Sequence, residues 1–521
     1  MHILSADKTP IELEHIPAEF LPAEPAPILH VATETAPPSL SDATRAFFAM
    51  HPPDAPATRA ARGIPAEPAP AVFRETRSGL MRIVHKELVI RFKPGTNQAV
   101  RARILEKHQL KVRSTNRFMT SQVVVYDATG RQSGAQLIDV ANACATMDEV
   151  VFATPNFVSE FRRKAAAAPR VHREQWHLHN KGRINGQLAG EDVDARGAWK
   201  ITTGSRAIVV AVLDDGVDVE HPHLKPNIRR KPDSSEPRDL VGRDFFIPDD
   251  DSPEHFNPRP KRFKHPYNRM TGNDIHGTPC AGVIAASGAD GGSSGIAPKC
   301  RILPVKVFHA DDLASDARVA DAIRYAATCA DVLSCSWTGP RSPDIELALE
   351  DAGTLGRNGK GSAAFFAAGN EDGDPVGYPA IDANAIAVGA STDQATLASY
   401  SNVGPEIWIV APSDGGIRGI FCTDVSDENR GFNLGDAQAG GADGLSTNDF
   451  GGTSSATPLA AGVAALMLSA NPGLDVDMIK SILKETAVKI GSGYNANGHS
   501  TKFGYGRVSA ARAVARAKEL R

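Results

Sequence analysis

The stretch GGTSSATPLAAGVAALML, from Gly451 to Leu468, is the part of the sequence that decides the fold. Its glycines and small hydroxyl residues lead into a long run of Ala, Val and Leu, which predicts a helix that is buried all round. Ser454 stands near the amino end of this helix, where unpaired backbone N–H groups favour a nearby negative charge. A simpler interpretation is that Ser454 or Ser455 caps the helix.

Strongly apolar segments precede this helix and alternate with helical ones. They are AIVVAVLDD, CRILPVKVF, ADVLSCSW, SAAFFAAGN and AIAVGAST. Strands that are apolar on both faces are typical of a parallel sheet with helices on both sides. The sequence therefore predicts one large α/β domain over residues 175–521.

The region before this domain has a different texture. The strand-like segments ELVIRF, SQVVVYDA and EVVFATPNFVSEF alternate with two helical segments. This order predicts a small α+β domain over residues 85–163, similar in outline to a ferredoxin-like fold. Residues 164–174 are expected to form a linker. Residues 1–75 are rich in Pro and Ala without periodicity, so we expect a disordered arm there.

Composition argues against several kinds of partner. The net charge of −4 over 521 residues gives no reason to expect nucleic acid or a membrane surface. No apolar run reaches the roughly 18 residues of a membrane span, and MHILSADKTPIELEH lacks the pattern of a secretory signal. The six cysteines form no CxxC pair, which favours free thiols in a reducing compartment. We expect a cytoplasmic protein, with secretion by a route without a conventional signal peptide as the alternative.

Three further motifs carry polar residues at the ends of predicted elements. Asp214 ends the strand of VAVLDDGVD, at the edge where open α/β sheets place their sites. His276 precedes the small-residue helix of GNDIHGTPCAGVIAA, and Asn370 ends the strand of SAAFFAAGNEDG. Taken singly, these are an acidic turn, a surface or core histidine and a structural asparagine.

The order of the motifs is specific. D-D-G, H-G-T, G-N and G-T-S-x-A-x-P follow one another, and the chain resembles the subtilase family of serine peptidases over about residues 170–515. DDG, SCSW and Cys280 resemble the kexin branch, whereas AAGNEDG and VGYPA are more similar to bacterial subtilisins. The resemblance implies a subtilisin-like catalytic domain that hydrolyses peptide bonds through an acyl-enzyme.

The resemblance also implies roles for single residues. Ser454 would be the nucleophile and His276 the general base that takes its proton. Asp214 would orient the imidazole, and Asn370 would donate to the oxyanion. Thr453 is a further candidate for support of this site.

Two segments are expected to bind substrate. The SCSWT edge would pair with the substrate backbone, and VGYPA would form the base of a roomy S1 pocket. The acidic turn after Asn370 would place negative charge at the pocket rim and favour a basic side chain; the alternative is a turn of solvated carboxylates. The residues assigned to substrate binding are Ser336, Trp337, Thr338, Gly377 and Glu371.

The domain over residues 85–163 has the place of the family's inhibitory propeptide. The expected partners are therefore protein or peptide substrates and this propeptide domain. Self-cleavage is expected between Arg162 and Glu174, after Arg163 or Lys164.

No cofactor is assigned, and the calcium site of the family is expected to be absent or weak. The family's HPDL motif supplies an aspartate to calcium, whereas this chain has HPHL, and the imidazole of His223 is a poor ligand for a hard cation. The polar insertion over about residues 225–270 is either a gate or a solvated loop. Peptide ligation or macrocyclisation, and a non-catalytic binding role, remain as alternative functions.

Overall fold

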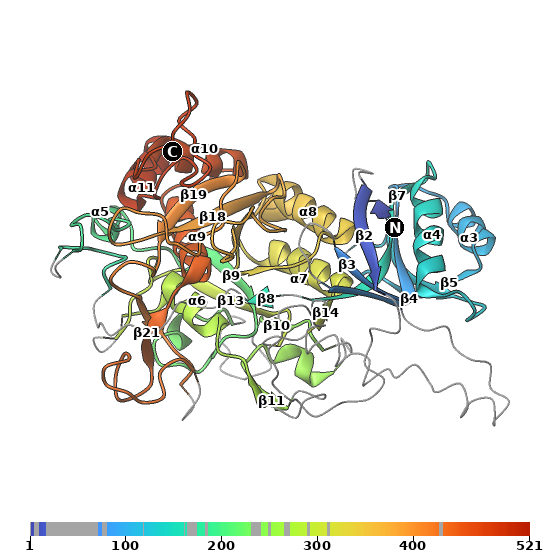
Figure 1. Ribbon diagram of the computed structural model, residues 1–521, viewed down its shortest axis with the longest axis horizontal. Coiled ribbons are helices and arrows are strands. Elements are labelled where there is room, and N and C mark those ends of the chain that lie inside the picture. The colour runs from blue at the N-terminus through green and yellow to red at the C-terminus, as the bar shows by residue number, and fades with distance from the viewer. Residues whose placement is uncertain are drawn as a thin grey trace, which may run out of the picture.

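The computed structural model of the protein contains two folded units that follow one another along the chain. The smaller N-terminal unit is blue and the larger unit runs from green to red (Figure 1). Strands β8 (Arg162–Arg163) and β14 (Leu313–Ser315) lie between them. The structure describes residues 2–4, 10–16, 71–75, 81–117, 119–160, 162–163, 175–182, 186–230, 241–247, 252–264, 271–288, 292–309, 313–426 and 431–521.

The larger unit is built on a seven-stranded sheet in the order β10-β13-β9-β15-β17-β18-β19, and every neighbouring pair is parallel. This confirms the predicted α/β class. Strand β9, the third in this order, lies where the chain order reverses, so its carboxyl end is a place where such sheets bind ligands. The strands are β10 (Arg243–Asp244), β13 (Arg301–Lys306), β9 (Val209–Asp214), β15 (Val332–Cys335), β17 (Ala363–Ala367), β18 (Ala385–Ser391) and β19 (Ile407–Pro412).

Helices cover both faces of this sheet, because alternate residues of its strands belong to two separate cores. Val210 and Val212 of β9 pack with α6 (Gly277–Ala285), α9 (Gly452–Ala470), α10 (Val476–Thr486) and α11 (Ala510–Glu519), beside the short α5 (Ala195–Trp199). Ala211 and Leu213 pack with α7 (Asp316–Cys329) and α8 (Pro343–Gly359). Helix α9 is apolar and long enough to cross a membrane, but 94% of this apolar stretch is buried, as in a core helix.

The N-terminal unit has the β-α-β-β-α-β order of a ferredoxin-like fold, which confirms the prediction. Its antiparallel sheet has the order β7-β4-β6-β5. Strand β5 was not predicted, because its segment LKVRST is short and alternates only over its first four residues; in the structure only Leu110 of its six residues is buried. The elements are β4 (Met81–Phe92), α3 (Gln98–Lys107), β5 (Leu110–Thr115), β6 (Gln122–Asp127), α4 (Gly134–Ala145) and β7 (Val150–Glu160).

The prediction of a disordered arm over residues 1–75 is wrong for three segments. His2–Leu4 (β1), Pro10–Ile16 (β2) and Ala71–Glu75 (β3) extend the sheet in the order β1-β2-β3-β4. Phe73 is fully buried in the core of the N-terminal unit, so this unit includes residues before the predicted start at 85. These short strands escaped notice because Pro and Ala dominate the composition around them. Residues 17–70 and the predicted linker over 164–174 lie outside the described residues.

The N-terminal unit packs on α7 and α8 through a charged contact, here called the seam. At its centre Val89 and Phe152 touch Leu347 of α8. Around this apolar centre lie four polar pairs, in which a basic or amide side chain of the N-terminal unit meets an aspartate of the larger unit. The pairs are Arg82–Asp316, Arg91–Asp351, Asn116–Asp321 and Gln122–Asp344.

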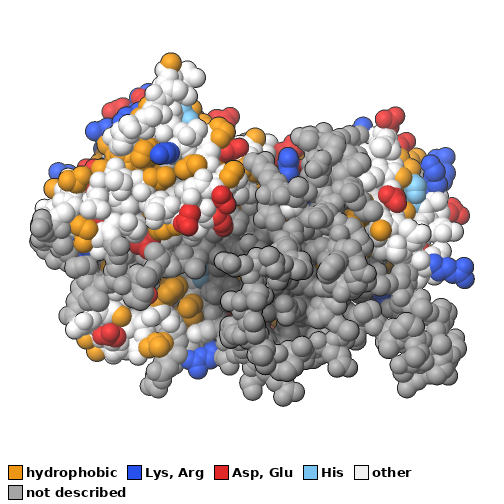
Figure 2. Space-filling model, in the orientation of Figure 1, with side chains coloured by type: hydrophobic (Ala, Val, Ile, Leu, Met, Phe, Trp, Pro, Cys, Tyr) orange, Lys and Arg blue, Asp and Glu red, His pale blue; other side chains and the backbone are white. Residues whose placement is uncertain are grey.

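Three smaller sheets complete the larger unit. Strand β16 (Trp337–Thr338) pairs with β8, β11 (Arg262–Lys264) with β12 (Thr271–Asn273), and β20 (Ile420–Thr423) with β21 (Ser446–Phe450). The predicted insertion over 225–270 contributes η2 (Lys225–Asn227), β10, η4 (Pro253–Phe256) and β11 among the described residues. On the face shown in Figure 2, the described acidic and basic side chains are interspersed, which agrees with the small net charge.

Candidate active site

Asp214 and His276 form the centre of the candidate site. Asp214 is the last residue of β9, and His276 is the N-cap of α6. The Nδ1 atom of His276 lies 2.9 Å and 3.0 Å from the two carboxylate oxygens of Asp214. The two residues are 1% and 3% exposed, so water screens their interaction weakly. This contact orients the imidazole ring.

Asp215 holds the turn that carries His276, and the sequence reasoning missed it. Its carboxylate accepts hydrogen bonds from the backbone N–H groups of Ile275, His276 and Gly277, at distances from 2.8 to 3.2 Å. Gly277 packs so closely that a Cβ atom would lie 2.3 Å from the carbonyl oxygen of Gly216. The acidic doublet in DDG was the available signal, because adjacent side chains at a strand end point in opposite directions.

Ser454 lies in the first turn of α9, as the small-residue motif predicted. The entry to this helix is tight: Asp414 accepts the N–H of Gly452 at 2.9 Å, and a Cβ atom on Gly451 would overlap the Asp414 carboxylate. The Ser454 hydroxyl donates to the carbonyl oxygen of Ser336 at 3.4 Å. Ser454 is 0% exposed, so substrate cannot reach it in this arrangement of the chain.

Cys280 connects the nucleophile candidate to the other two residues. Its Sγ atom lies 3.7 Å from Asp214 Oδ2, 3.8 Å from His276 Nδ1 and 3.7 Å from the carbonyl oxygen of Ser454. The three residues predicted as a triad therefore surround one thiol. The Asp214, His276 and Cys280 donor atoms lie within 4.8 Å of one another, close enough to hold a metal ion. Burial raises the pKa of the Cys280 thiol well above its usual value, which opposes metal binding through a thiolate.

Asn370 is positioned by the residue that precedes Ser454. Its Oδ1 atom accepts hydrogen bonds from the backbone N–H and the hydroxyl of Thr453, at 2.9 Å and 2.8 Å. Because the backbone N–H and the hydroxyl of Thr453 both donate to Oδ1 of Asn370, the Nδ2 donor of the same amide points away from Thr453. Thr453 thus gives the support for this site that the sequence suggested.

The predicted substrate edge is occupied by the protein's own chain. Trp337 pairs with Arg163 and Thr338 with Arg162 in an antiparallel register. Ser336 adjoins this edge, and its hydroxyl donates to the carbonyl oxygen of Ser454 at 3.0 Å.

The substrate role predicted for Trp337 is corrected to its backbone alone. Its side chain is 0% exposed, donates to the carbonyl oxygen of Leu213 at 2.8 Å and packs on Phe308 and Phe366. Strand β14 forms a second edge, paired with β7, which the sequence reasoning missed. Its three residues are too few to show a period.

Gly377 lies in a segment that is hydrogen-bonded to two other segments, which begin after β17 and β16. Its N–H donates to the carbonyl oxygen of Ala368 in the first of these, and Gly339 in the second donates to the carbonyl oxygen of Tyr378. A Cβ atom on Gly377 would lie 3.0 Å from the methyl carbon of Thr338. The side chain of Thr338 therefore borders the space that the glycine leaves open.

Among the described residues at the family's calcium position, His223 presents an imidazole where the family has a carboxylate. The ring of His223 fills the space beside Gly292, where a Cβ atom would lie 1.9 Å from its Cε1. The side-chain amide of Gln175 donates to the carbonyl oxygen of Ser294 at 2.6 Å and accepts the N–H of Ser294 at 3.0 Å. Both polar atoms of this amide are therefore already hydrogen-bonded. All six cysteines are free thiols, as predicted.

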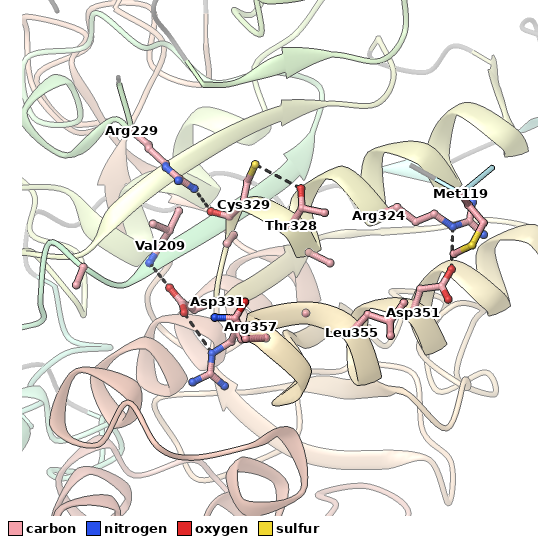
Figure 3. Close-up of a pocket in the computed structure, with 15 residues that line it drawn as sticks. Met119, Val209, Arg229, Arg324, Thr328, Cys329, Asp331, Asp351, Leu355 and Arg357 are labelled. Atoms are coloured by element: carbon pink, nitrogen blue, oxygen red, sulfur yellow. Dashed lines mark hydrogen bonds and ion pairs between the residues drawn. The ribbon is translucent and has the colours of Figure 1, made fainter. Parts of the chain in front are cut away.

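A cavity of about 460 Å³ lies at the amino end of β9 and contains no predicted site residue. Its charged groups are paired with groups of the same cavity: Arg324 with Asp351, and Arg357 with Asp331 (Figure 3). Since Asp214 lies at the opposite end of β9, this cavity is separate from the candidate site.

Comparison with known proteins places this geometry in a family. The model of the Subtilase family matches residues 205–506, more than half of the chain, and the chain therefore belongs to the subtilase family. A calcium-dependent protease of Nostoc sp. is 36% identical over 408 residues, which cover 73% of this chain and 56% of the relative. Kexin of Candida albicans is 30% identical over 365 residues, which cover 66% of this chain and 34% of the relative.

A solved structure shares the fold. The crystal structure of fervidolysin from Fervidobacterium pennivorans, a keratinolytic enzyme related to subtilisin, has a TM-score of 0.61 and 21% identity. The similarity covers 85% of this chain and 62% of fervidolysin. The chain spans about half the length of the first curated relatives it matches.

Proposed function

We propose that this chain is a serine endopeptidase of the subtilisin type, made as a proenzyme that processes itself. The observation that carries the proposal is the pairing of Arg162–Arg163 with Trp337–Thr338, beside the residue that contacts Ser454. A peptide strand is bound there by main-chain pairing, which is how extended substrates bind to a sheet edge. The burial of Ser454 and His276 agrees with a latent form whose cleft is filled.

The proposed reaction uses four groups. The Ser454 hydroxyl turns from the Ser336 carbonyl to Nε2 of His276, gives up its proton and attacks the substrate carbonyl carbon. Asn370 Nδ2 and the backbone N–H of Ser454 hold the oxyanion that forms. His276 then returns the proton to the leaving amine while Asp214 stabilises the imidazolium. Water attacks the acyl-enzyme with His276 as base, which releases the acid and restores the hydroxyl.

The register of β8 supports a processing site directly after this strand. Trp337 opposite Arg163 and Thr338 opposite Arg162 follow one antiparallel register. Ser336, whose hydroxyl donates to the Ser454 carbonyl oxygen, precedes Trp337, and Lys164, which follows Arg163 in the sequence, lies outside the described residues. The Lys164–Ala165 bond is therefore the proposed scissile bond.

Processing is expected to create a new N-terminus at Ala165, which intact mass measurement and N-terminal sequencing check. Lys164→Asp is expected to slow processing by about tenfold or more, the usual size of a mismatch in a side-chain pocket. Arg170→Asp makes the same charge change outside this register and is the matched control. Cleavage at another bond, or equal slowing by both substitutions, would contradict the assignment.

The seam is expected to open more readily as pH rises, because of Asp321. Burial and the nearby Asp344 carboxylate raise the pKa of Asp321 to about 7, while Arg324 and the hydrogen bond from Asn116 oppose the shift. With the seam formed, the pKa of Asp321 lies above that of a carboxyl group in water. The Asp321 carboxyl therefore stabilises the seam at low pH, and this stabilisation is lost as pH rises toward 7. The side chain keeps 24% exposure, which moderates the effect.

Size-exclusion chromatography of the processed protein checks this pH dependence. The N-terminal fragment is expected to remain bound at pH 5.5 and to dissociate more at pH 8. Asp321→Asn is expected to reduce this difference, whereas Asp139→Asn, at an exposed position on α4, leaves it in place. The same difference in both variants would assign the pH dependence to another group.

The proposed function itself is tested by digestion of a peptide library, read by mass spectrometry with Ser454→Ala as the blank. Hydrolysis products that depend on Ser454 support a peptidase, and joined or cyclic products support the ligase alternative. Absence of any Ser454-dependent product after processing would refute catalysis and favour a binding role.

A further inference from the structure

Besides Thr453, the residues Glu371 and Asn402 form hydrogen bonds with the turn that carries Asn370. One carboxylate oxygen of Glu371, Oε2, accepts the backbone N–H of Asn370 at 3.1 Å and the Nδ2 of Asn402 at 2.7 Å. The backbone N–H of Glu371 donates in return to Oδ1 of Asn402 at 2.8 Å. The two side chains and the backbone of the turn thus form a closed set of hydrogen bonds, here called the clamp.

The clamp is anchored in the protein interior. Asn402 is 2% exposed, and its Nδ2 also donates to the carbonyl oxygen of Pro375 at 3.0 Å. Its backbone N–H donates to the carbonyl oxygen of Gly369 at 3.1 Å. Asn402 therefore contacts both residues that flank Asn370, Gly369 and Glu371.

Gly369 shows how closely the clamp approaches the oxyanion turn. Its φ of +126° is a conformation that L side chains rarely adopt, and a Cβ atom would lie 2.2 Å from Asn402 Nδ2 and 2.6 Å from Glu371 Oε2. Only glycine leaves room for the carboxylate to reach the backbone of Asn370. Thr453 fixes the side chain of Asn370 by donating to its Oδ1, and Glu371 fixes the backbone of Asn370 by accepting its N–H.

We propose that Glu371 is a positioning residue for the oxyanion donor, acting through Asn402 and the backbone of Asn370. This inference rests on the proposed function and deepens it, because oxyanion stabilisation requires a donor that is fixed before the reaction. The role differs from selection of a basic substrate side chain by charge, which the acidic turn suggested in the sequence. The two roles require different properties of the residue: an acceptor oxygen for positioning, and a negative charge for selection.

Three substitutions separate the two roles. Glu371→Ala removes both the acceptor and the charge. Glu371→Gln removes the charge but keeps one carbonyl oxygen, which is sufficient because both hydrogen bonds go to the same oxygen. Asp374→Ala removes an exposed negative charge from the same turn, and no hydrogen bond of its carboxylate is described.

The kinetic measurement compares kcat and KM on two peptides that differ only in Lys or Leu before the scissile bond. Glu371→Ala is expected to lower kcat by about tenfold on both peptides with little change in KM, less than the loss of 10²-fold or more for removal of an oxyanion donor. Glu371→Gln is expected to restore most of kcat, and Asp374→Ala to retain it. A rise in KM confined to the Lys peptide, equal in Glu371→Ala and Glu371→Gln, would overturn the proposal.

Hydrogen–deuterium exchange tests the clamp independently of catalysis. In the Ser454→Ala background, Glu371→Ala is expected to accelerate exchange in peptides that contain residues 369–374, because the N–H of Asn370 loses its acceptor. Glu371→Gln is expected to keep the protection. Unchanged exchange in Glu371→Ala would overturn the clamp even if the protein is an active peptidase, and accelerated exchange would support it even if the protein is not.

Discussion

Replacement of Ser454 by Ala is expected to abolish peptide hydrolysis and to leave the chain at full length. The expected loss in kcat is on the order of 10⁶-fold, a size borrowed from subtilisin, the relative in which removal of the nucleophile has this effect. The physical reason is that alanine has no hydroxyl to attack the substrate carbonyl, so no acyl-enzyme can form. Hydrolysis of a peptide substrate and the mass of the purified chain after prolonged incubation measure the two effects.

Ser455→Ala is the matched control, because it changes the next residue of the same helix. The hydroxyl of Ser455 bonds to the hydroxyl of Ser413 at 2.8 Å and has no place in the proposed reaction. We expect this variant to process itself and to retain most of the activity. Processing of the Ser454→Ala chain at the wild-type rate, in the absence of any added peptidase, would exclude self-cleavage.

Replacement of Arg82 by Met is expected to weaken the binding of the N-terminal unit to the larger unit by roughly 10²–10⁴-fold. Arg82 is 0% exposed; it pairs with Asp316, donates to the carbonyl oxygen of Arg341 and lies 3.9 Å from the centre of the Phe157 ring. Removal of one partner from a buried ion pair costs about 3–5 kcal/mol, because the other charge stays buried without compensation. The measurement is the dissociation constant of the N-terminal fragment from the larger unit after processing. It is obtained by diluting the complex and following the peptidase activity that appears as the fragment dissociates.

Arg113→Met provides a control on the same sheet. Arg113 pairs with Glu87 but is 64% exposed, and such surface pairs contribute about 1 kcal/mol or less. In the double variant of Arg82→Met with Asp316→Leu, part of the binding should return because no buried charge remains unpaired. Equal dissociation constants for Arg82→Met and Arg113→Met would show that the seam does not depend on this pair.

Local patterns of the sequence predicted elements whose own residues carry the whole signal. The small-residue run from Gly451 became α9, and GAQLIDVANACA became α4 with the predicted bounds, because helical periodicity is a property of adjacent residues. The apolar runs of the larger unit became buried parallel strands for the same reason. The motifs also contain glycines at places of close approach in the structure, namely Gly277 and Gly369.

Elements whose stability comes from a partner far along the chain could not be predicted. Strands β1, β2 and β3 pair in turn onto β4, and within a Pro- and Ala-rich region their short segments give only a weak local signal, such as the alternation of PIELEHI in β2. The side chain of Trp337 belongs to the core, although its motif indicated only a strand beside the cleft. The seam pairs residues such as Arg82 and Asp316, separated by 234 positions, and no local pattern marks either of them.

The sequence by itself determined the subtilase family, the order of the motifs and the helical or strand character of the segments that carry them, because these depend on residue type and short-range period. Only the tertiary structure decided that Arg162–Arg163 lies on Trp337–Thr338, that Asp215 holds the histidine turn and that the carboxylate of Glu371 faces Asn370 and Asn402. These contacts depend on strand register and on the direction of side chains, which packing between distant segments sets.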